Sequence, residues 1–162
     1  LTGADPGWTS RERRPSRKPM AKPDPALLDP RRYPFVCTIE PRFGDLDVNM
    51  HINNVAMAGI LEDSRVRFHY RNGFATRRGG ATSMVASVAI EYLGEGAYPD
   101  PVRIACAIED IGRTSQRLVQ LVMQHDRPLA FARTVMVSVS PEGPVPLTAE
   151  FVEGAAPWML RA

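Results

Sequence analysis

Residues 42–54 read Arg42-Phe43-Gly44-Asp45-Leu46-Asp47-Val48-Asn49-Met50-His51-Ile52-Asn53-Asn54. This polar turn leads directly into a segment in which apolar residues recur at regular intervals. In residues 55–70 the residues that recur at helical spacing are Met57, Ile60, Leu61, Ser64 and Phe68. Either Asn53 or Asn54 is a suitable N-cap, and Asn72-Gly73 is a suitable stop. The pattern therefore predicts one long helix that begins where the turn ends.

Outside the turn and the helix, apolar residues recur at every second position. Residues 34–42 alternate as a strand, and the other expected strands are 83–93, 102–111, 115–124 and 129–140. Short turns join the last four strands, which is typical of an antiparallel meander. A short helix is expected around 149–152. The pattern alone predicts an α+β domain in which a helix packs on an antiparallel sheet.

The two ends of the chain have a different composition. Residues 1–31 contain Pro6, Pro15, Pro19, Pro23, Pro25 and Pro30 and little apolar periodicity, which is typical of disorder. We therefore expect a disordered Pro/Arg-rich tail at 1–31, a folded domain at 32–152 and a C-terminal tail at 153–162. Met20 is a plausible natural start, so whether residues 1–19 belong to the natural protein stays open.

Length and charge exclude several classes of protein. The 162 residues suffice for one domain, and no stretch approaches the ~18 apolar residues of a membrane span. Six of the 20 basic residues lie in residues 1–22, so the rest of the chain is near neutral and predicts no nucleic-acid partner. The three histidines and two cysteines lack metal-ligand spacing, so we expect no metal site and no cofactor. Without a secretory signal, a cytoplasmic location is expected.

The turn and helix together carry a family resemblance. Residues 42–65 (RFGDLDVNMHINNVAMAGILEDSR) resemble the signature of the 4-hydroxybenzoyl-CoA thioesterase-like group of hot-dog proteins. They are also similar to the plant acyl-ACP thioesterases, which carry an Asp-Leu-Asp-Val-Asn-x-His-Val-Asn-Asn run. The resemblance extends more loosely over 34–151. It implies a single hot-dog domain, in which a curved antiparallel sheet wraps a long central helix, and a hydrolase of acyl-CoA or acyl carrier protein thioesters in fatty acid metabolism.

Thioester hydrolysis has two chemical needs that the turn can meet. The tetrahedral oxyanion needs donors, and the first turn of a helix offers free amides, here at Asn53, Asn54 and Val55. A carboxylate must attack the carbonyl carbon or activate a water, and Asp47 stands just before the helix. The sequence therefore predicts an oxyanion site beside a catalytic carboxylate.

The resemblance assigns further roles. It implies that Asp47 is the catalytic carboxylate, with Asn49 and His51 as its partners. His51 would orient water or assist proton transfer, and Asn49 would orient the substrate or Asp47. Asp45 is expected to be structural, bonding nearby turn amides. Glu62 stays open between a surface or intersubunit salt bridge and a polar active-site residue.

Two histidines stand outside this motif. We expect His69 and His125 on the solvent side. Neither takes part in the predicted site.

Two other functions remain open. One is a non-catalytic hot-dog protein that binds acyl thioesters; the other is a hot-dog dehydratase or hydratase using His51 and Glu62. Met57 stands where the group often has a tyrosine, so we expect different packing beside the acyl channel. The plant enzymes have two fused halves and a further acidic catalytic residue, whereas this chain has room for one half, so their carrier-protein preference does not transfer. Because the strands are apolar on both faces, we expect a homodimer or homotetramer.

Overall fold

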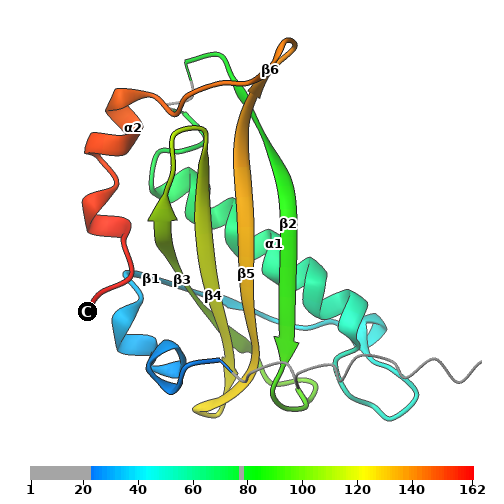
Figure 1. Cartoon of the computed structure of the whole chain (residues 1–162). Coiled ribbons are helices and arrows are strands. Elements are labelled where there is room, and N and C mark those ends of the chain that lie inside the picture. Colours follow the sequence, from blue (N-terminus) through cyan, green and yellow to red (C-terminus); the bar gives the residue numbers. More distant parts are fainter. Residues whose placement is uncertain (1–22, 77–78) are drawn as a thin grey trace, which may run out of the picture.

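The computed structural model describes residues 23–76 and 79–162 (Figure 1). The long helix α1 (Asn54–Arg71) lies against a six-stranded antiparallel sheet. Its strands are β1 (Phe35–Ile39), β2 (Thr82–Tyr92), β3 (Val102–Ile111), β4 (Ser115–Gln124), β5 (Arg127–Ser140) and β6 (Gly143–Pro144). Their order is β1-β3-β4-β5-β2, with β6 beside β5. The hot-dog α+β fold is thus confirmed, with the sheet curled around one helix.

Helix α1 begins and ends at the predicted signals. Asn53 is its N-cap, since the Asn53 Oδ1 accepts a hydrogen bond of 2.7 Å from the amide of Ala56. At the other end the Asn72 amide bonds to the Phe68 carbonyl at 2.9 Å, and Gly73 follows with φ of 82°. This left-handed conformation favours glycine and stops the helix.

The main core lies between α1 and the sheet. The buried residues of α1 are Met57, Ile60, Leu61, Ser64, Arg65, Phe68 and His69. They face the even-numbered side chains of the central strands, including Ile104 and Ile108 of β3 and Leu118 and Val122 of β4. Each fully buried apolar side chain contributes roughly 1.5–3 kcal/mol to folding, so this layer fixes the helix on the sheet.

His69 does not lie on the solvent side as expected. It is buried, its ring centroid lies 4.7 Å from that of Phe74, and its Nε2 lies 3.5 Å from Gln116 Nε2. The chain beyond α1 folds back over this last turn, with the Ala75 amide bonded to the His69 carbonyl at 3.1 Å. A loop that returns over the helix end is not visible in the helical periodicity.

The N-terminal part of the chain differs from the expected tail. Residues 23–31, placed in the disordered tail by the sequence, form most of two 3-10 helices, η1 (Pro25–Leu28) and η2 (Pro30–Arg32). Leu27 and Tyr33 are buried in a second apolar cluster on the sheet face away from α1, and the Tyr33 hydroxyl donates to the Leu27 carbonyl at 2.6 Å. Part of the sheet face away from α1 is apolar, and this segment orders by covering it. The expected disorder of residues 1–22 lies outside the described residues.

The C-terminal residues 153–162 also differ from a tail that frays. They include the 3-10 helix η4 (Ala156–Trp158), which follows α2 (Ala149–Glu153). Trp158 and Met159 pack against the main core, and Met159 pairs with Ile108 of β3 as an isolated parallel bridge.

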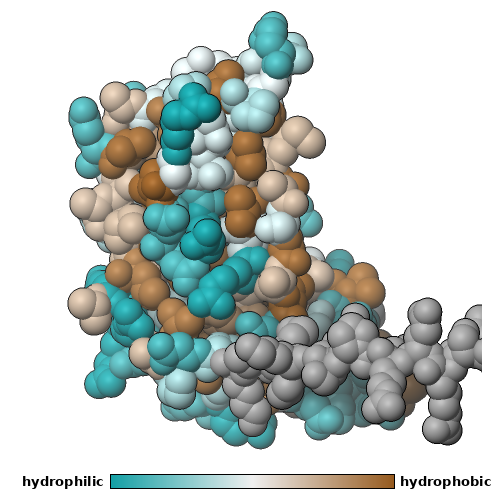
Figure 2. All heavy atoms as spheres, viewed as in Figure 1, coloured by the Kyte–Doolittle hydropathy of each residue, from teal (hydrophilic) through white to brown (hydrophobic). Residues whose placement is uncertain are grey.

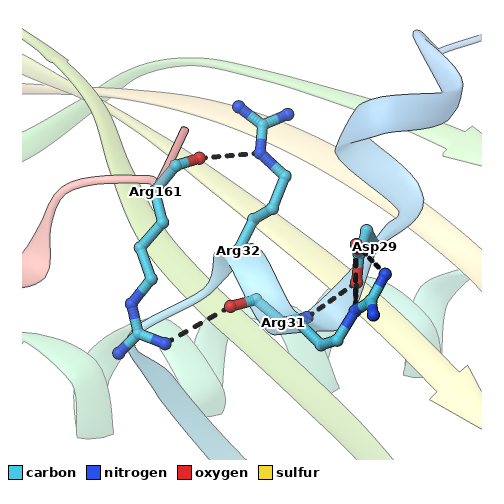
Figure 3. Close-up of polar contacts among 4 residues, drawn as sticks. All are labelled: Asp29, Arg31, Arg32 and Arg161. Atoms are coloured by element: carbon cyan, nitrogen blue, oxygen red, sulfur yellow. Dashed lines mark hydrogen bonds and ion pairs between the residues drawn. The ribbon is translucent and has the colours of Figure 1, made fainter.

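Both ends of the described chain meet on one side of the domain (Figure 1). The Arg161 amide donates to the Arg32 carbonyl at 2.8 Å. Figure 3 shows a second bond between the two residues, from Arg32 Nε to the Arg161 carbonyl at 2.7 Å. Arg31 pairs with Asp29 at 2.8 Å. The folded domain therefore extends beyond residues 32–152 on both sides.

The sheet face away from α1 is of mixed polarity. Figure 2 shows hydrophilic side chains in the middle of this face and hydrophobic ones on either side. An ion-pair network contributes to it, with Arg133 donating to Glu109 at 3.0–3.1 Å and Arg117 lying 3.9 Å from the same carboxylate. In the described part of the chain, no helix combines the length and apolar character needed to cross a membrane.

Candidate functional site

The chain from Leu46 to Ile52, here called the motif hairpin, turns back on itself just before α1. Leu46 and Ile52 pair as an isolated antiparallel bridge. The Asp47 amide donates to the His51 carbonyl at 2.8 Å, and the Met50 amide donates to the Asp47 carbonyl at 3.0 Å. Met50, at the tip, has φ of 63°, in the left-handed region. The hairpin therefore places Asp47 and His51 opposite each other.

The two carboxylate oxygens of Asp47 have different environments. Oδ1 accepts hydrogen bonds from the amides of Asn49 at 2.8 Å and His51 at 3.1 Å. Oδ2 has no hydrogen-bond partner among residues 23–76 and 79–162. One oxygen thus stabilises the hairpin, while the other is available for a water or a substrate atom.

Asn49 and His51 contribute to the site in unequal ways. Asn49 is exposed, and its contact to Asp47 is through its backbone amide. The His51 Nε2 lies 3.5 Å from Glu95 Oε2, in the loop that follows β2. Sequence reasoning missed Glu95, because nothing in the sequence brings a residue of that turn next to the motif.

The start of α1 presents free amide donors. The Asn53 amide donates to the Asp45 carbonyl at 2.9 Å, and the Asn53 side chain caps the helix by accepting the Ala56 amide. The amides of Asn54 and Val55 have no acceptor within the described residues, and both residues are exposed. Because these amides stand at the positive end of the helix, they suit an oxyanion. The Asn54 carbonyl accepts a 3.2 Å hydrogen bond from the Tyr92 hydroxyl of β2.

Asp45 has the structural role that the sequence predicted. Its buried carboxylate accepts hydrogen bonds from the Arg42 guanidinium at 2.9 Å and from the Arg42 amide at 2.7 Å. These hydrogen bonds, that of the guanidinium first, hold the pKa of Asp45 below its usual range. Asp45 therefore fixes the turn that precedes the motif hairpin.

Glu62 stands apart from the motif hairpin. It is exposed, two turns along α1, and no hydrogen bond or ion pair in the described chain joins it to Asp47 or His51. Its charge acts on the buried Arg65, whose pKa is lowered by burial and raised in part by Glu62. Within the described chain, Glu62 therefore lies beside a buried cation.

A hollow at this end of the domain contains only some of the expected site residues. It has a volume of about 880 Å³ and lies between β1, the turn at Asp45 and α1. Asn53 and Val55 line it, whereas Asp47, Asn49, His51, Asn54 and Glu62 do not. Of the predicted residues, this hollow therefore brings together Asn53 and Val55 alone.

The side chains that could bind a metal are dispersed in the described part of the chain, where no three His, Cys, Asp or Glu side chains gather closely enough to hold an ion. The candidate site, as predicted from the sequence, consists of a carboxylate, an imidazole and backbone amides.

Comparison with known proteins places the chain in a family. Residues 41–154 match the thioesterase-like superfamily, so the chain belongs to that superfamily and the resemblance of the motif is confirmed. No curated protein matches it.

Solved structures with the same fold include thioesterases. A thioesterase from Thermus thermophilus, in complex with coenzyme A and zinc, is 25% identical with a TM-score of 0.71, over 80% of this chain and 98% of the other. A Staphylococcus aureus protein in complex with CoA is 17% identical with a TM-score of 0.72, over 79% and 85%. A gentisyl-coenzyme A thioesterase is 16% identical with a TM-score of 0.66, over 75% and 99%. Family and neighbours together support thioester hydrolysis as the broad class of chemistry.

Proposed function

We propose that the protein hydrolyses acyl-CoA thioesters to a free acid and the CoA thiol, with Asp47 as the catalytic carboxylate. The proposal rests on the different environments of the two carboxylate oxygens of Asp47. One oxygen is bound to two hairpin amides, and the other has no partner in the described chain. The oxygen without a partner is available to bind a water or to attack a carbonyl carbon, as a general base or a nucleophile must.

The chemistry follows from these groups. A water attacks the thioester carbonyl carbon while Asp47 takes its proton, or the Asp47 carboxylate attacks first and water then hydrolyses the mixed anhydride. The amides of Asn54 and Val55 stabilise the oxyanion, a contribution that can be worth roughly 10²–10³ in rate per donor. The oxyanion collapses, the C–S bond breaks, and the CoA thiolate takes up a proton. Asn49 and His51 orient the water or the substrate.

CoA is the proposed thiol because two structurally similar proteins bind it. The Thermus and Staphylococcus structures were determined with coenzyme A bound. An acyl carrier protein presents the same phosphopantetheine arm, so it serves as the alternative thiol in the test below. The acyl group itself is left to that test.

We also propose that the working unit is a homodimer or homotetramer. Strand β2 ends the sheet, and within the described chain its outer edge has no neighbouring strand. Its exposed apolar side chains are Met84, Val85, Val88 and Tyr92. A long, apolar, unpaired edge is avoided in monomers, because it templates association with another chain. A partner there would also enclose the Asn54 end of α1, which Tyr92 contacts.

The experiment that tests the function is a thiol-release assay. It uses acyl-CoAs from short to long chain, aryl-CoAs, and one matching acyl carrier protein thioester. The proposal expects at least one acyl-CoA to be hydrolysed with saturation kinetics. Binding of acyl-CoAs without thiol release across the panel would contradict it and identify a non-catalytic binder.

A further inference from the structure

We infer that Gln124, at the end of β4, is a positioning residue for the candidate site. It holds the segment Ala97–Asp100 in place, and that segment continues the loop on which the motif hairpin rests. The inference builds on the proposed function, because the hairpin carries Asp47. It assigns Gln124 no contact with the substrate.

Both the Nε2 and the Oε1 of Gln124 form hydrogen bonds with this one segment. Its Nε2 donates to the carbonyls of Ala97 and Asp100, each at 2.8 Å, and its Oε1 accepts the Ala97 amide at 2.9 Å. The residue is 1% exposed, so these bonds form away from water. Buried hydrogen bonds of this kind are costly to break, because the groups left behind stay unpaired.

The same loop is joined to the motif hairpin. His51 pairs with Ala97 as an isolated antiparallel bridge, and the Ile52 amide donates to the Gly96 carbonyl at 2.9 Å. At Gly96 an added Cβ would lie 2.8 Å from Ile52 Cδ1, so the loop and the hairpin approach closely. Glu95, next in this loop, places its carboxylate 3.5 Å from His51 Nε2. A displacement of residues 95–97 would therefore move His51 and, across the hairpin, Asp47.

Packing alone does not call for glutamine at this position. The same face of β4 holds apolar Leu118 and Val122 against the core. Gln120 shares that face and is equally buried, but its Nε2 donates to the Leu61 carbonyl and to Ser64 Oγ on α1. The two glutamines thus have different roles: Gln120 fixes the helix, and Gln124 fixes the loop under the hairpin.

The test compares Gln124→Leu with Gln120→Leu in the full-length protein. Both changes remove one buried amide from the same strand face, so a merely structural role predicts similar effects. The readouts are the melting temperature, kcat and KM for the best acyl-CoA, and hydrogen exchange of the Ile52 amide relative to amides in the middle of β4. We expect both variants to have lower melting temperatures. Only Gln124→Leu should lower kcat, by about tenfold or more with KM within about twofold, since small misplacements of catalytic groups are costly.

Gln124→Glu provides a second variant should Gln124→Leu fail to fold. It keeps the shape of the side chain and the acceptor for the Ala97 amide, but it loses both N–H donors to the Ala97 and Asp100 carbonyls. We therefore expect kcat to fall again and hydrogen exchange of the Ile52 amide to become faster. Equal kcat loss in Gln120→Leu and Gln124→Leu, or unchanged kcat and Ile52 exchange in Gln124→Glu, would overturn the inference. Should the wild-type protein hydrolyse no thioester, the proposed function fails, and Ile52 exchange still decides whether Gln124 holds the hairpin.

Discussion

Asp47 and His51 hold each other across the motif hairpin by two hydrogen bonds. The Asp47 amide donates to the His51 carbonyl at 2.8 Å, and Asp47 Oδ1 accepts the His51 amide at 3.1 Å. Both bonds use the backbone of His51, so its imidazole is free to act independently. Asp47 is therefore at once a structural residue of the hairpin and the candidate catalytic carboxylate.

His51→Ala should reduce turnover less than a change at Asp47. The variant keeps the hairpin, because the bonds of residue 51 to Asp47 are backbone bonds. It loses only the imidazole and its 3.5 Å contact with Glu95, an exposed pair worth little to stability. We expect kcat to fall by about tenfold or less and the melting temperature to change little. A loss of about 10²-fold or more in steady-state assays would make His51 the central catalytic group instead.

Asp45→Asn should act on stability and not primarily on chemistry. Its pKa is lowered by the Arg42 hydrogen bonds, so the ionised carboxylate stabilises the fold above about pH 4, and this contribution is lost as pH falls through the folded-state pKa. We expect the variant to be about 1 kcal/mol less stable in urea at pH 7, with the difference vanishing in acid. Asp63→Asn, which loses an exposed pair with Arg67, is the control and should cost less. A pH-independent difference for Asp45→Asn would contradict this account.

Thr134→Val should stabilise the protein. Thr134 of β5 is 0% exposed, and its hydroxyl has no hydrogen-bond partner within the described chain. Valine keeps the branched shape and removes the unpaired polar group, so the free energy of unfolding should rise by about 1 kcal/mol. Ser64→Ala is the contrasting variant, because that buried hydroxyl donates to the Leu61 carbonyl at 2.9 Å, and its removal should destabilise. Chemical denaturation checks both; a destabilised Thr134→Val would show that the hydroxyl is satisfied in solution.

Val88→Lys should weaken self-association. Val88 is exposed on the edge strand β2, beside Thr134 in register. A lysine on an edge strand opposes pairing with another chain. Sedimentation velocity should show the wild type as a dimer or tetramer and the variant shifted toward monomer at the same micromolar concentration. A wild type that is monomeric there would contradict the proposed assembly.

The fold was largely predictable because the signals for it are local. Helix α1 follows from the apolar period after the motif, with its cap at Asn53 and its stop at Asn72-Gly73. The alternation of apolar and polar residues predicts the strands in the same way. The ordered segments at 23–31 and 153–162 were missed, because they have no periodicity of their own and order by packing on a sheet face and on each other.

The candidate site was predictable only in part. The motif itself indicates Asp47, Asn49 and His51, since they are neighbours in one loop. Two supporting residues are distant in sequence. The sheet topology places Glu95 beside His51 and lets Gln124 hold the loop that pairs with the hairpin. The role of Glu62 stays open, because helical spacing does not tell which face of α1 looks toward the motif.

The role of Asp47 can be measured through kcat of the Asp47→Asn variant on the best acyl-CoA. Oδ1 alone accepts both hairpin amides, so asparagine can keep these bonds through its amide oxygen while losing the anionic charge. We therefore predict an unchanged melting temperature, KM within about twofold, and kcat lower by about 10²-fold or more. Near-wild-type kcat in a folded Asp47→Asn variant, above all if Glu62→Gln were inactive, would contradict the assignment of Asp47 as the catalytic carboxylate.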